Sequence, residues 1–174
     1  RRSDTKPVER VPPRPEWTAP AQAMDYFRAL AAVDESVGRV LETLEAQGQL
    51  HNTLVIYAGD NGMFWGEHRR GDKRVPYEEA LRIPLLMRYP RAIAPGTVVD
   101  EMVLNIDVAP TVCDAATVPA PDVMQGRTVL PLFEEEEADW RDAFLYEYWV
   151  DYTPAIPRIV GIRTEGYKLL RYPD

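Results

Sequence analysis

The stretch TLVIYAGDNGMFWGEHRRGDKRVPYEEALRIPLL, residues 53–86, decides the fold and contains the polar residues of greatest interest. It begins with TLVIYA, a β-branched and aromatic run that is short enough for a strand and apolar on both faces. Such a strand usually lies in the middle of a parallel sheet. A polar, glycine-bearing segment follows at residues 59–74, then a short helix near residues 76–80 and a second apolar strand, IPLLMRY. This order predicts an α/β fold with a polar loop after a buried strand.

Upstream of this stretch, residues 20–47 have the periodicity of a helix with one buried stripe. Apolar side chains recur there every three or four residues, at Tyr26, Leu30, Val33, Val37, Leu41 and Leu44. Gly48 is a suitable residue to end this helix. Residues 1–20 are rich in proline and charge, which predicts an irregular arm.

Downstream, the segment EMVLNID predicts another strand, and VAPTVCDAAT predicts a helix with Pro110 in its first turn. The acidic run at residues 134–139 is typical of a solvated loop. The segments AFLYEYWV, IPRIVGIRT and YKLLRYP are spaced like a small antiparallel sheet. We therefore expect an irregular arm over residues 1–20, an α/β body over 21–133 and an antiparallel C-terminal subdomain over 140–174.

Composition narrows the classes of protein to consider. The 174 residues are 45% hydrophobic, enough for a sizeable core, and 28 acidic against 20 basic residues give a net charge of -8. This balance argues against general binding to nucleic acid or anionic lipid, so an anionic substrate would need locally placed bases. The single cysteine, Cys113, excludes an internal disulfide framework. No apolar run is long enough to span a membrane and the first residues have no signal-peptide core, so we expect a soluble chain of undetermined compartment.

The polar segment opens with two oxygen donors, Asp60 and Asn61, directly after the apolar strand. Ligand sites in open α/β sheets lie beyond the carboxyl ends of strands. A carboxylate beside an amide oxygen suits calcium or magnesium. Two ligands are too few for calcium, so the rest must come from other segments, water or substrate. Taken alone, Asp-Asn-Gly is also a common turn sequence.

Two further polar residues follow in the same loop. Lys73 lies twelve residues after Asn61, and an ammonium beside a divalent cation suits a phosphate or sulfate oxygen. His68 could donate a hydrogen bond to the same group or act as a general acid. A lone lysine in a polar loop is more often solvated, and a lone histidine more often makes a structural hydrogen bond.

At these residues the chain resembles the sulfatases of the alkaline-phosphatase-like superfamily. The blocks that carry the resemblance are VDESVGRVLETLEAQGQLHNTLVIYAGDNG, GEHRRGDKRVPYEEALRIPLLMRYP, VLNIDVAPTVCDAATVPAPDVMQGRTVLPLF and IVGIRTEGYKLLRYP. They follow the order of the second half of family members and cover most of residues 26–133 and about 158–173. The resemblance implies an alkaline-phosphatase-like mixed sheet flanked by helices, of which this chain holds the second half, followed by a truncated antiparallel C-terminal sheet.

The resemblance also implies roles for the loop residues. Asp60 and Asn61 match ligands of a calcium ion, with magnesium possible, and Lys73 matches a base that contacts the sulfate. His68 matches a residue common in a subgroup and is the weaker catalytic candidate. The resemblance further implies hydrolysis of a small-molecule or carbohydrate sulfate ester by a formylglycine nucleophile.

The chain departs from the family pattern in one decisive respect. The C/S-x-P-S-R motif that supplies formylglycine is absent, and Cys113 lacks the proline and arginine that would follow it. We therefore expect the nucleophile outside this chain, in a missing N-terminal half that acts as its partner, and we expect the fragment alone to be inactive.

Other interpretations remain open at this point. The chain could belong to a phosphonate monoester or phosphodiester hydrolase of the same superfamily, or be a non-catalytic, cation-binding remnant. The aromatic residues Trp65, Tyr148, Trp149 and Tyr152 could line a pocket, although aromatic residues in strands and loops more often serve packing.

Overall fold

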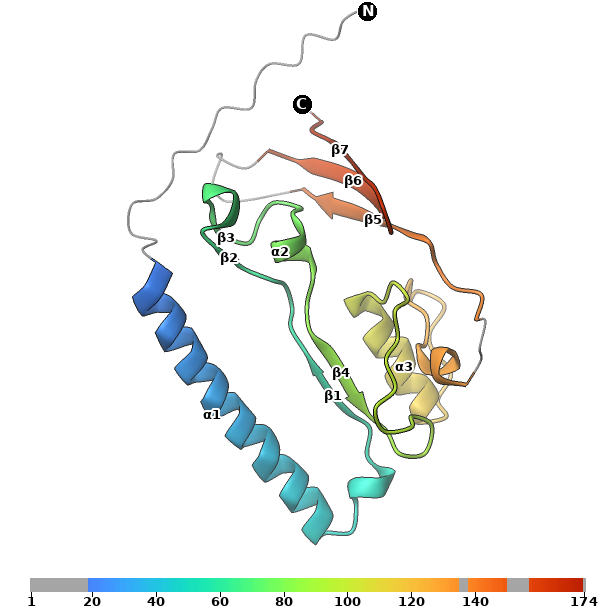
Figure 1. The fold of residues 1–174 in the computed structure, drawn as a ribbon. Coiled ribbons are helices and arrows are strands. Elements are labelled where there is room, and N and C mark those ends of the chain that lie inside the picture. Colours follow the sequence, from blue (N-terminus) through green and yellow to red (C-terminus); the bar gives the residue numbers. More distant parts are fainter. Residues whose placement is uncertain (1–18, 135–137, 150–156, 174) are drawn as a thin grey trace, which may run out of the picture.

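The computed structural model describes residues 19–134, 138–149 and 157–173 (Figure 1). In chain order, its helices and strands are α1 (Ala19–Ala46), β1 (Val55–Ala58), β2 (Phe64–Trp65), β3 (Gly71–Asp72), α2 (Glu78–Leu81), β4 (Leu85–Arg88), α3 (Val108–Ala115), β5 (Ala143–Tyr148), β6 (Ile159–Thr164) and β7 (Lys168–Arg171). Between them lie short 3-10 helices, η1 (Leu50–Asn52), η2 (Glu67–Arg69), η3 (Asn105–Asp107) and η4 (Leu130–Phe133). The predicted arm at residues 1–18 and part of the acidic loop, residues 135–137, lie outside the described residues.

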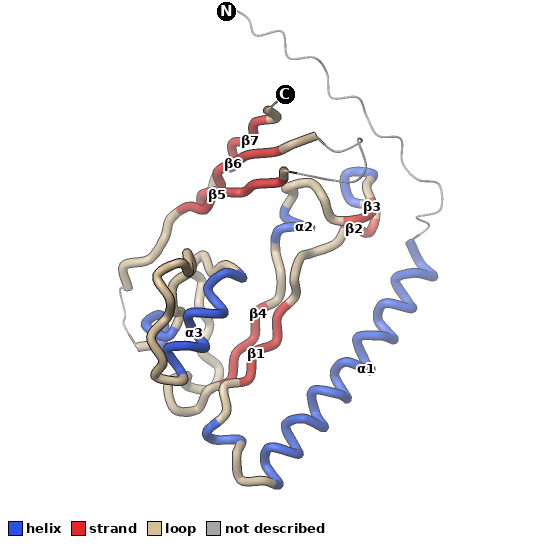
Figure 2. The backbone as a smooth tube through the Cα atoms, turned by 180° about the vertical axis from the view of Figure 1, so that it is seen from behind, coloured by secondary structure: helices blue, strands red, loops and turns tan. Residues whose placement is uncertain are grey.

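Helix α1 confirms the predicted helix but not its buried stripe. It ends before Gly48, whose φ of 67° lies in the left-handed region that glycine adopts at helix ends. Tyr26 and Val33, on the expected stripe, are 44% and 41% exposed. Val33 borders a hollow of about 450 Å³ between α1 and the β1–β4 ribbon, which residues of all three elements line. In Figures 1 and 2 the helix runs beside this ribbon and is joined to it at one end through η1.

Strand β1 pairs with β4 in antiparallel register, from Val55 opposite Arg88 to Ala58 opposite Leu85. The expectation that β1 lies in the middle of a parallel sheet is therefore wrong for the pairing found among the described residues. A parallel partner needs a crossover of a dozen or more residues, usually a helix. The connection over residues 59–84 is long enough for a crossover, but it holds a two-stranded hairpin and the four-residue α2 in place of a crossover helix, and the chain returns antiparallel to β1.

The strand predicted for EMVLNID is also not formed. Residues 101–104 belong to no strand, and Asn105–Asp107 is the 3-10 helix η3. Side chains satisfy the backbone there instead of a sheet: the Asp107 carboxylate accepts from Leu104 N at 2.8 Å, and Trp140 Nε1 donates to Met102 O at 2.9 Å. The helix predicted after it is confirmed as α3, with Pro110 near its start.

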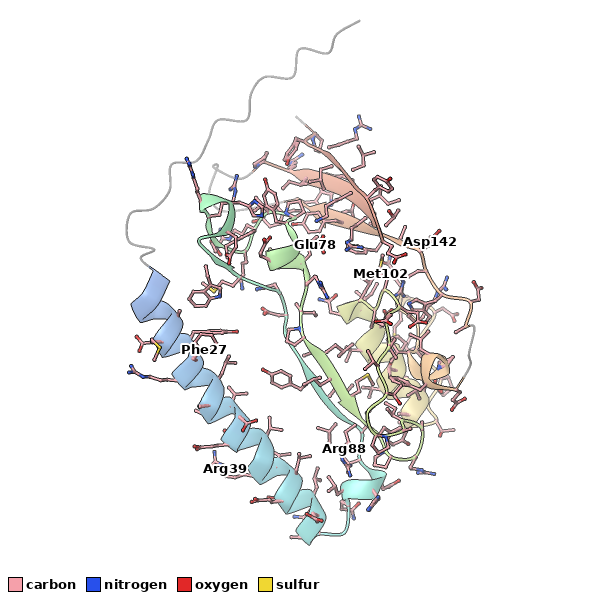
Figure 3. The ribbon with its side chains drawn as sticks, viewed as in Figure 1. Phe27, Arg39, Glu78, Arg88, Met102 and Asp142 are labelled. Carbon is pink, nitrogen blue, oxygen red and sulfur yellow. The ribbon has the colours of Figure 1, made fainter. Side chains whose placement is uncertain are left out.

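The C-terminal strands form the predicted antiparallel sheet, in the order β5-β6-β7. Glu78, at the start of α2, holds this sheet against the helix (Figure 3). Its carboxylate lies 2.6 Å from Lys168 Nζ and 3.2 Å from Arg163 Nη2. Lys168 Nζ also donates to Pro76 O at 2.6 Å. The β5–β7 sheet is thereby fixed to residues 76–78, shortly after Lys73.

Candidate functional site

The two predicted metal ligands lie where β1 ends. Asp60 Oδ1 accepts from Asn61 N at 2.9 Å, and Asn61 Nδ2 donates to Gly62 O at 2.9 Å. This orientation uses the nitrogen end of the amide locally, so Oδ1, an acceptor, is the atom that could bind a cation. Gly62 passes so close to α2 that an added Cβ would lie 1.9 Å from Glu79 O, while Gly62 N donates to Ala80 O at 2.9 Å. Glycine is therefore required at this position by close backbone approach.

The hairpin β2–β3 brings Lys73 back to the same place. Its pairs are Phe64 with Asp72 and Trp65 with Gly71, and Phe64 is fully buried, which anchors the hairpin. Asp72 has a φ of 71°, a left-handed conformation that aspartate tolerates better than most residues. As a result, Lys73 Nζ lies 3.9 Å from Asp60 Oδ2, although thirteen positions separate the two residues. Both side chains remain accessible, at 44% and 85% exposure.

These residues open onto one cleft of about 560 Å³. Asp60, Asn61, Lys73 and Arg74 form one wall, the end of α2 and the segment around η3 form another, and β5 closes the third side. The cleft is therefore polar and cationic at the β1 end and more apolar along β5. The locally placed bases that an anionic substrate would require are present in the adjacent pair Lys73 and Arg74.

His68 lies elsewhere in the loop and is not among the residues that line this cleft. Its ring stacks on Tyr77, with 4.0 Å between ring centroids and 16° between the planes. Nε2 lies 3.2 Å from Glu79 Oε1. The structure thus brings Asp60, Asn61 and Lys73 together but holds His68 against α2 and the residue before it.

The donor set fits part of a site for a hard cation. Asp60 and Asn61 offer oxygen atoms side by side at an exposed strand end, as calcium and magnesium require. Among the described residues, no three His, Cys, Asp or Glu side chains gather closely enough to hold a metal ion. This part of the chain can therefore supply some ligands of a shared site, with the remainder coming from other segments or from water.

Several residues that line the cleft were not predicted from the sequence. Arg74 directly follows Lys73, and that adjacency was the available signal. Asn105 was not a candidate site residue, because the sequence predicts a strand for its segment and the structure forms η3 there instead. Tyr146 was not predicted, although it lies two positions before Tyr148, a candidate pocket residue. Both tyrosines line the cleft. Among the other aromatic candidates, Trp65 packs on Tyr26 at 4.9 Å between centroids, Trp149 is 49% exposed, and Tyr152 lies outside the described residues.

Comparison with known proteins places this arrangement in a family. Residues 3–118 match the Sulfatase family, and residues 66–174 match the family described as N-sulphoglucosamine sulphohydrolase, C-terminal. The chain therefore belongs to the sulfatase family. Its α/β body with a small antiparallel sheet corresponds to the alkaline-phosphatase-like fold of its structural neighbours.

Individual relatives agree with this assignment. An N-acetylglucosamine-6-O-sulfatase of Bacteroides thetaiotaomicron is 42% identical over 161 residues, which are 90% of this chain and 29% of that protein. A protein solved in complex with its substrate D-glucosamine-2-N,6-O-disulfate superposes with a TM-score of 0.77 at 43% identity, over 82% of this chain and 30% of the other. A phosphonate monoester hydrolase of Agrobacterium radiobacter gives a TM-score of 0.72 at 26% identity, over 82% of this chain and 31% of the other. The chain thus spans about three tenths of the length of these relatives. No helix in the described ranges is long and apolar enough to cross a membrane.

Proposed function

We propose that this chain supplies the C-terminal part of the active site of a sulfatase that hydrolyses sulfate esters of carbohydrates. The observation that carries the proposal is the convergence of Asp60, Asn61 and Lys73 on one cleft, with Lys73 Nζ 3.9 Å from Asp60 Oδ2. Oxygen donors beside an ammonium suit a cation and a tetrahedral anion held together. Membership of the sulfatase family supports this assignment.

In this proposal each residue has a separate role. Asp60 and Asn61 hold a divalent cation, calcium or magnesium, together with ligands from outside this chain. When bound, that cation neutralises negative charge on the sulfate oxygens. Lys73 donates a hydrogen bond to a sulfate oxygen and stabilises the charge that builds there as the ester bond breaks. The nucleophile, expected to be formylglycine, comes from residues outside this chain.

The carbohydrate part of the proposal rests on the relatives. The N-acetylglucosamine-6-O-sulfatase shares 42% identity with this chain, and the structure solved with a glucosamine disulfate shares 43%. The phosphonate monoester hydrolases resemble the chain at 26% and 28% identity. Hydrolysis of phosphonate monoesters or phosphodiesters is therefore the second candidate, supported by the shared fold.

The test compares ester classes in the intact enzyme. We expect turnover of a sugar sulfate to exceed that of a phosphonate monoester or a phosphodiester. Lys73→Ala and Asp60→Ala should each lower kcat/KM for the sugar sulfate by roughly 10²–10³-fold, as expected for the loss of one group that stabilises the transition state. Both side chains are accessible, so after removal of calcium the melting temperature should stay near that of the wild type treated in the same way. Near-normal turnover by either variant would contradict the roles of Lys73 and Asp60, and calcium binding without turnover of any ester would favour a non-catalytic remnant.

A further inference from the structure

The wall of the cleft formed by β5 carries a row of aromatic side chains. Phe144, Tyr146 and Tyr148 alternate along the strand and all three line the cleft, as do Leu145 and Glu147 between them. Alternate residues of a strand lie on the same face, about 7 Å apart. The row is therefore long enough to contact one or two sugar rings.

Pairing within the sheet shows which way this row faces. Phe144 lies opposite Arg163, which lies opposite Lys168. Paired residues share a face of the sheet, and both basic side chains reach Glu78 on α2. The face that bears Phe144, Tyr146 and Tyr148 is consequently the one directed toward α2 and the cleft.

The opposite face of the same sheet has a different environment. Leu145, Ile162 and Leu169, paired in one row across the three strands, are 63%, 47% and 65% exposed. The tyrosines of β5 are half-buried by comparison. Leu145, on β5 itself, still borders the cleft, whereas Ile162 and Leu169 of the same row do not line it. The tyrosines differ from Leu145 in lying on the half-buried face, the one that Arg163 and Lys168 share.

The chemistry of this wall suits a sugar. Aromatic ring faces pack against the apolar C–H face of a pyranose, and a phenol hydroxyl exchanges hydrogen bonds with ring hydroxyls. Burial, together with the neighbouring Tyr148 and Tyr172, raises the pKa of Tyr146, so its hydroxyl stays protonated and able to donate at neutral pH. The cleft, at about 560 Å³, has far more room than a sulfate group alone occupies.

We propose that Tyr146 and Tyr148 contact the sugar of the sulfate ester and thereby determine which esters the site accepts. This inference rests on the proposed function, because it assigns the leaving-group side of the same cleft. Asp60, Asn61 and Lys73 then hold the sulfate end at one wall, and β5 holds the sugar at the other. Selection among esters comes from the tyrosines, since the sulfate end is common to all of them.

The experiment measures kcat/KM of the intact enzyme for two substrates, 6-O-sulfated N-acetylglucosamine and 4-nitrophenyl sulfate. Tyr146→Phe and Tyr148→Phe should each lower kcat/KM for the sugar sulfate about tenfold, the change expected for one lost hydrogen bond, and Tyr146→Ala should lower it further. The value for the aryl sulfate should change by less than about threefold, because that ester lacks the sugar hydroxyls. Tyr167→Phe is the matched control, since Tyr167 is 85% exposed, and it should alter neither value.

The outcomes distinguish failure of the tyrosine assignment from failure of the proposed function. Equal losses on both substrates, or no loss on either with Tyr146→Phe, would overturn the inference while leaving the proposed function standing. A wild-type enzyme that hydrolyses neither ester would instead refute the proposed function. The phenylalanine variants keep the ring and its packing, so the test holds even where the alanine variant fails to fold.

Discussion

Arg141 donates two hydrogen bonds to the carboxylate of Asp107, which has no exposed surface. Nη2 lies 2.7 Å from Oδ1, and Nη1 bonds Oδ2. The same carboxylate accepts from the backbone nitrogens of Leu104 and Arg127, both at 2.8 Å. The buried Asp107 side chain thus connects η3, the segment before η4 and the segment that leads into β5. Residues around η3 and on β5 line two walls of the cleft.

Removing Arg141 should therefore be costly. Arg141→Ala leaves a buried carboxylate without its charged partner, so the free energy of unfolding should fall by about 3–5 kcal/mol. Urea denaturation of the intact protein measures this change. Arg28→Ala is the matched control, because Arg28 and Asp25 form an exposed pair, and such pairs contribute about 0–1 kcal/mol. Similar losses in the two variants would show that the Asp107 contact does not support the fold.

Gly62→Ala should distort the end of β1. The added Cβ would lie 1.9 Å from Glu79 O and 2.9 Å from its carbonyl carbon, so the chain must move away from α2. That movement breaks the hydrogen bond from Gly62 N to Ala80 O and displaces the neighbouring Asp60 and Asn61. We expect lower melting temperature together with reduced activity. Gly166→Ala, where no atom lies within 4 Å of the new Cβ, should alter neither property.

Glu78 should make stability depend on pH. Burial alone would raise the pKa of Glu78, but hydrogen bonds and charge from Arg163 and Lys168 outweigh it, so the pKa lies below the ordinary value of 4.5. The folded state therefore favours the ionised carboxylate, and its stabilising effect is present above pH 4.5 and lost as pH falls through the lowered pKa. The difference in melting temperature between the wild type and Glu78→Gln should be largest near pH 7 and shrink toward pH 3. The exposed Glu45→Gln control should show no such trend, and a difference for Glu78→Gln that stays constant with pH would contradict this role.

These contacts show which parts of the site a sequence can predict. Asp60, Asn61 and Lys73 follow a recognisable strand and lie within one loop, which made a shared site conceivable, and the resemblance to the sulfatases implied their roles in it. Contacts made across long separations left no such pattern. The segment EMVLNID predicts a strand, and nothing in it indicates that Asp107 pairs with Arg141, which lies 34 residues later.

Strand direction and burial were harder to predict for a related reason. An apolar run indicates that a strand is covered but not the direction of its neighbour, so β1 was expected in a parallel sheet and pairs antiparallel with β4. Periodicity likewise predicted the apolar stripe of α1, yet it could not show that a hollow separates Val33 and its neighbours from the ribbon. In β5, spacing predicted a strand of an antiparallel sheet, but only the register with Arg163 and Lys168 shows which face is directed toward α2.

Metal binding offers a test that is independent of turnover. A ligand that binds the folded state alone stabilises it by about 2.7 kcal/mol at a concentration 100 times its dissociation constant. After chelation, calcium added to the intact enzyme should raise the melting temperature, and Asp60→Ala or Asn61→Ala should remove most of that rise. Asp25→Ala, on the exposed surface of α1, should keep it. A full calcium response in both site variants would place the cation elsewhere.

Variants of His68 distinguish a catalytic role of this residue from a positioning role. Its stacking on Tyr77 and its contact with Glu79 lead us to propose that it anchors the loop that presents Lys73. His68→Phe retains a ring that can stack on Tyr77, so it should keep most of kcat and the wild-type pH profile, whereas His68→Ala should destabilise the protein by about 0.5–1.5 kcal/mol. A general acid would behave differently, because its loss lowers kcat by roughly 10²–10⁴-fold and removes one limb of the pH profile in both variants. His51→Ala, at the exposed η1, controls for loss of an imidazole and should leave kcat and melting temperature unchanged.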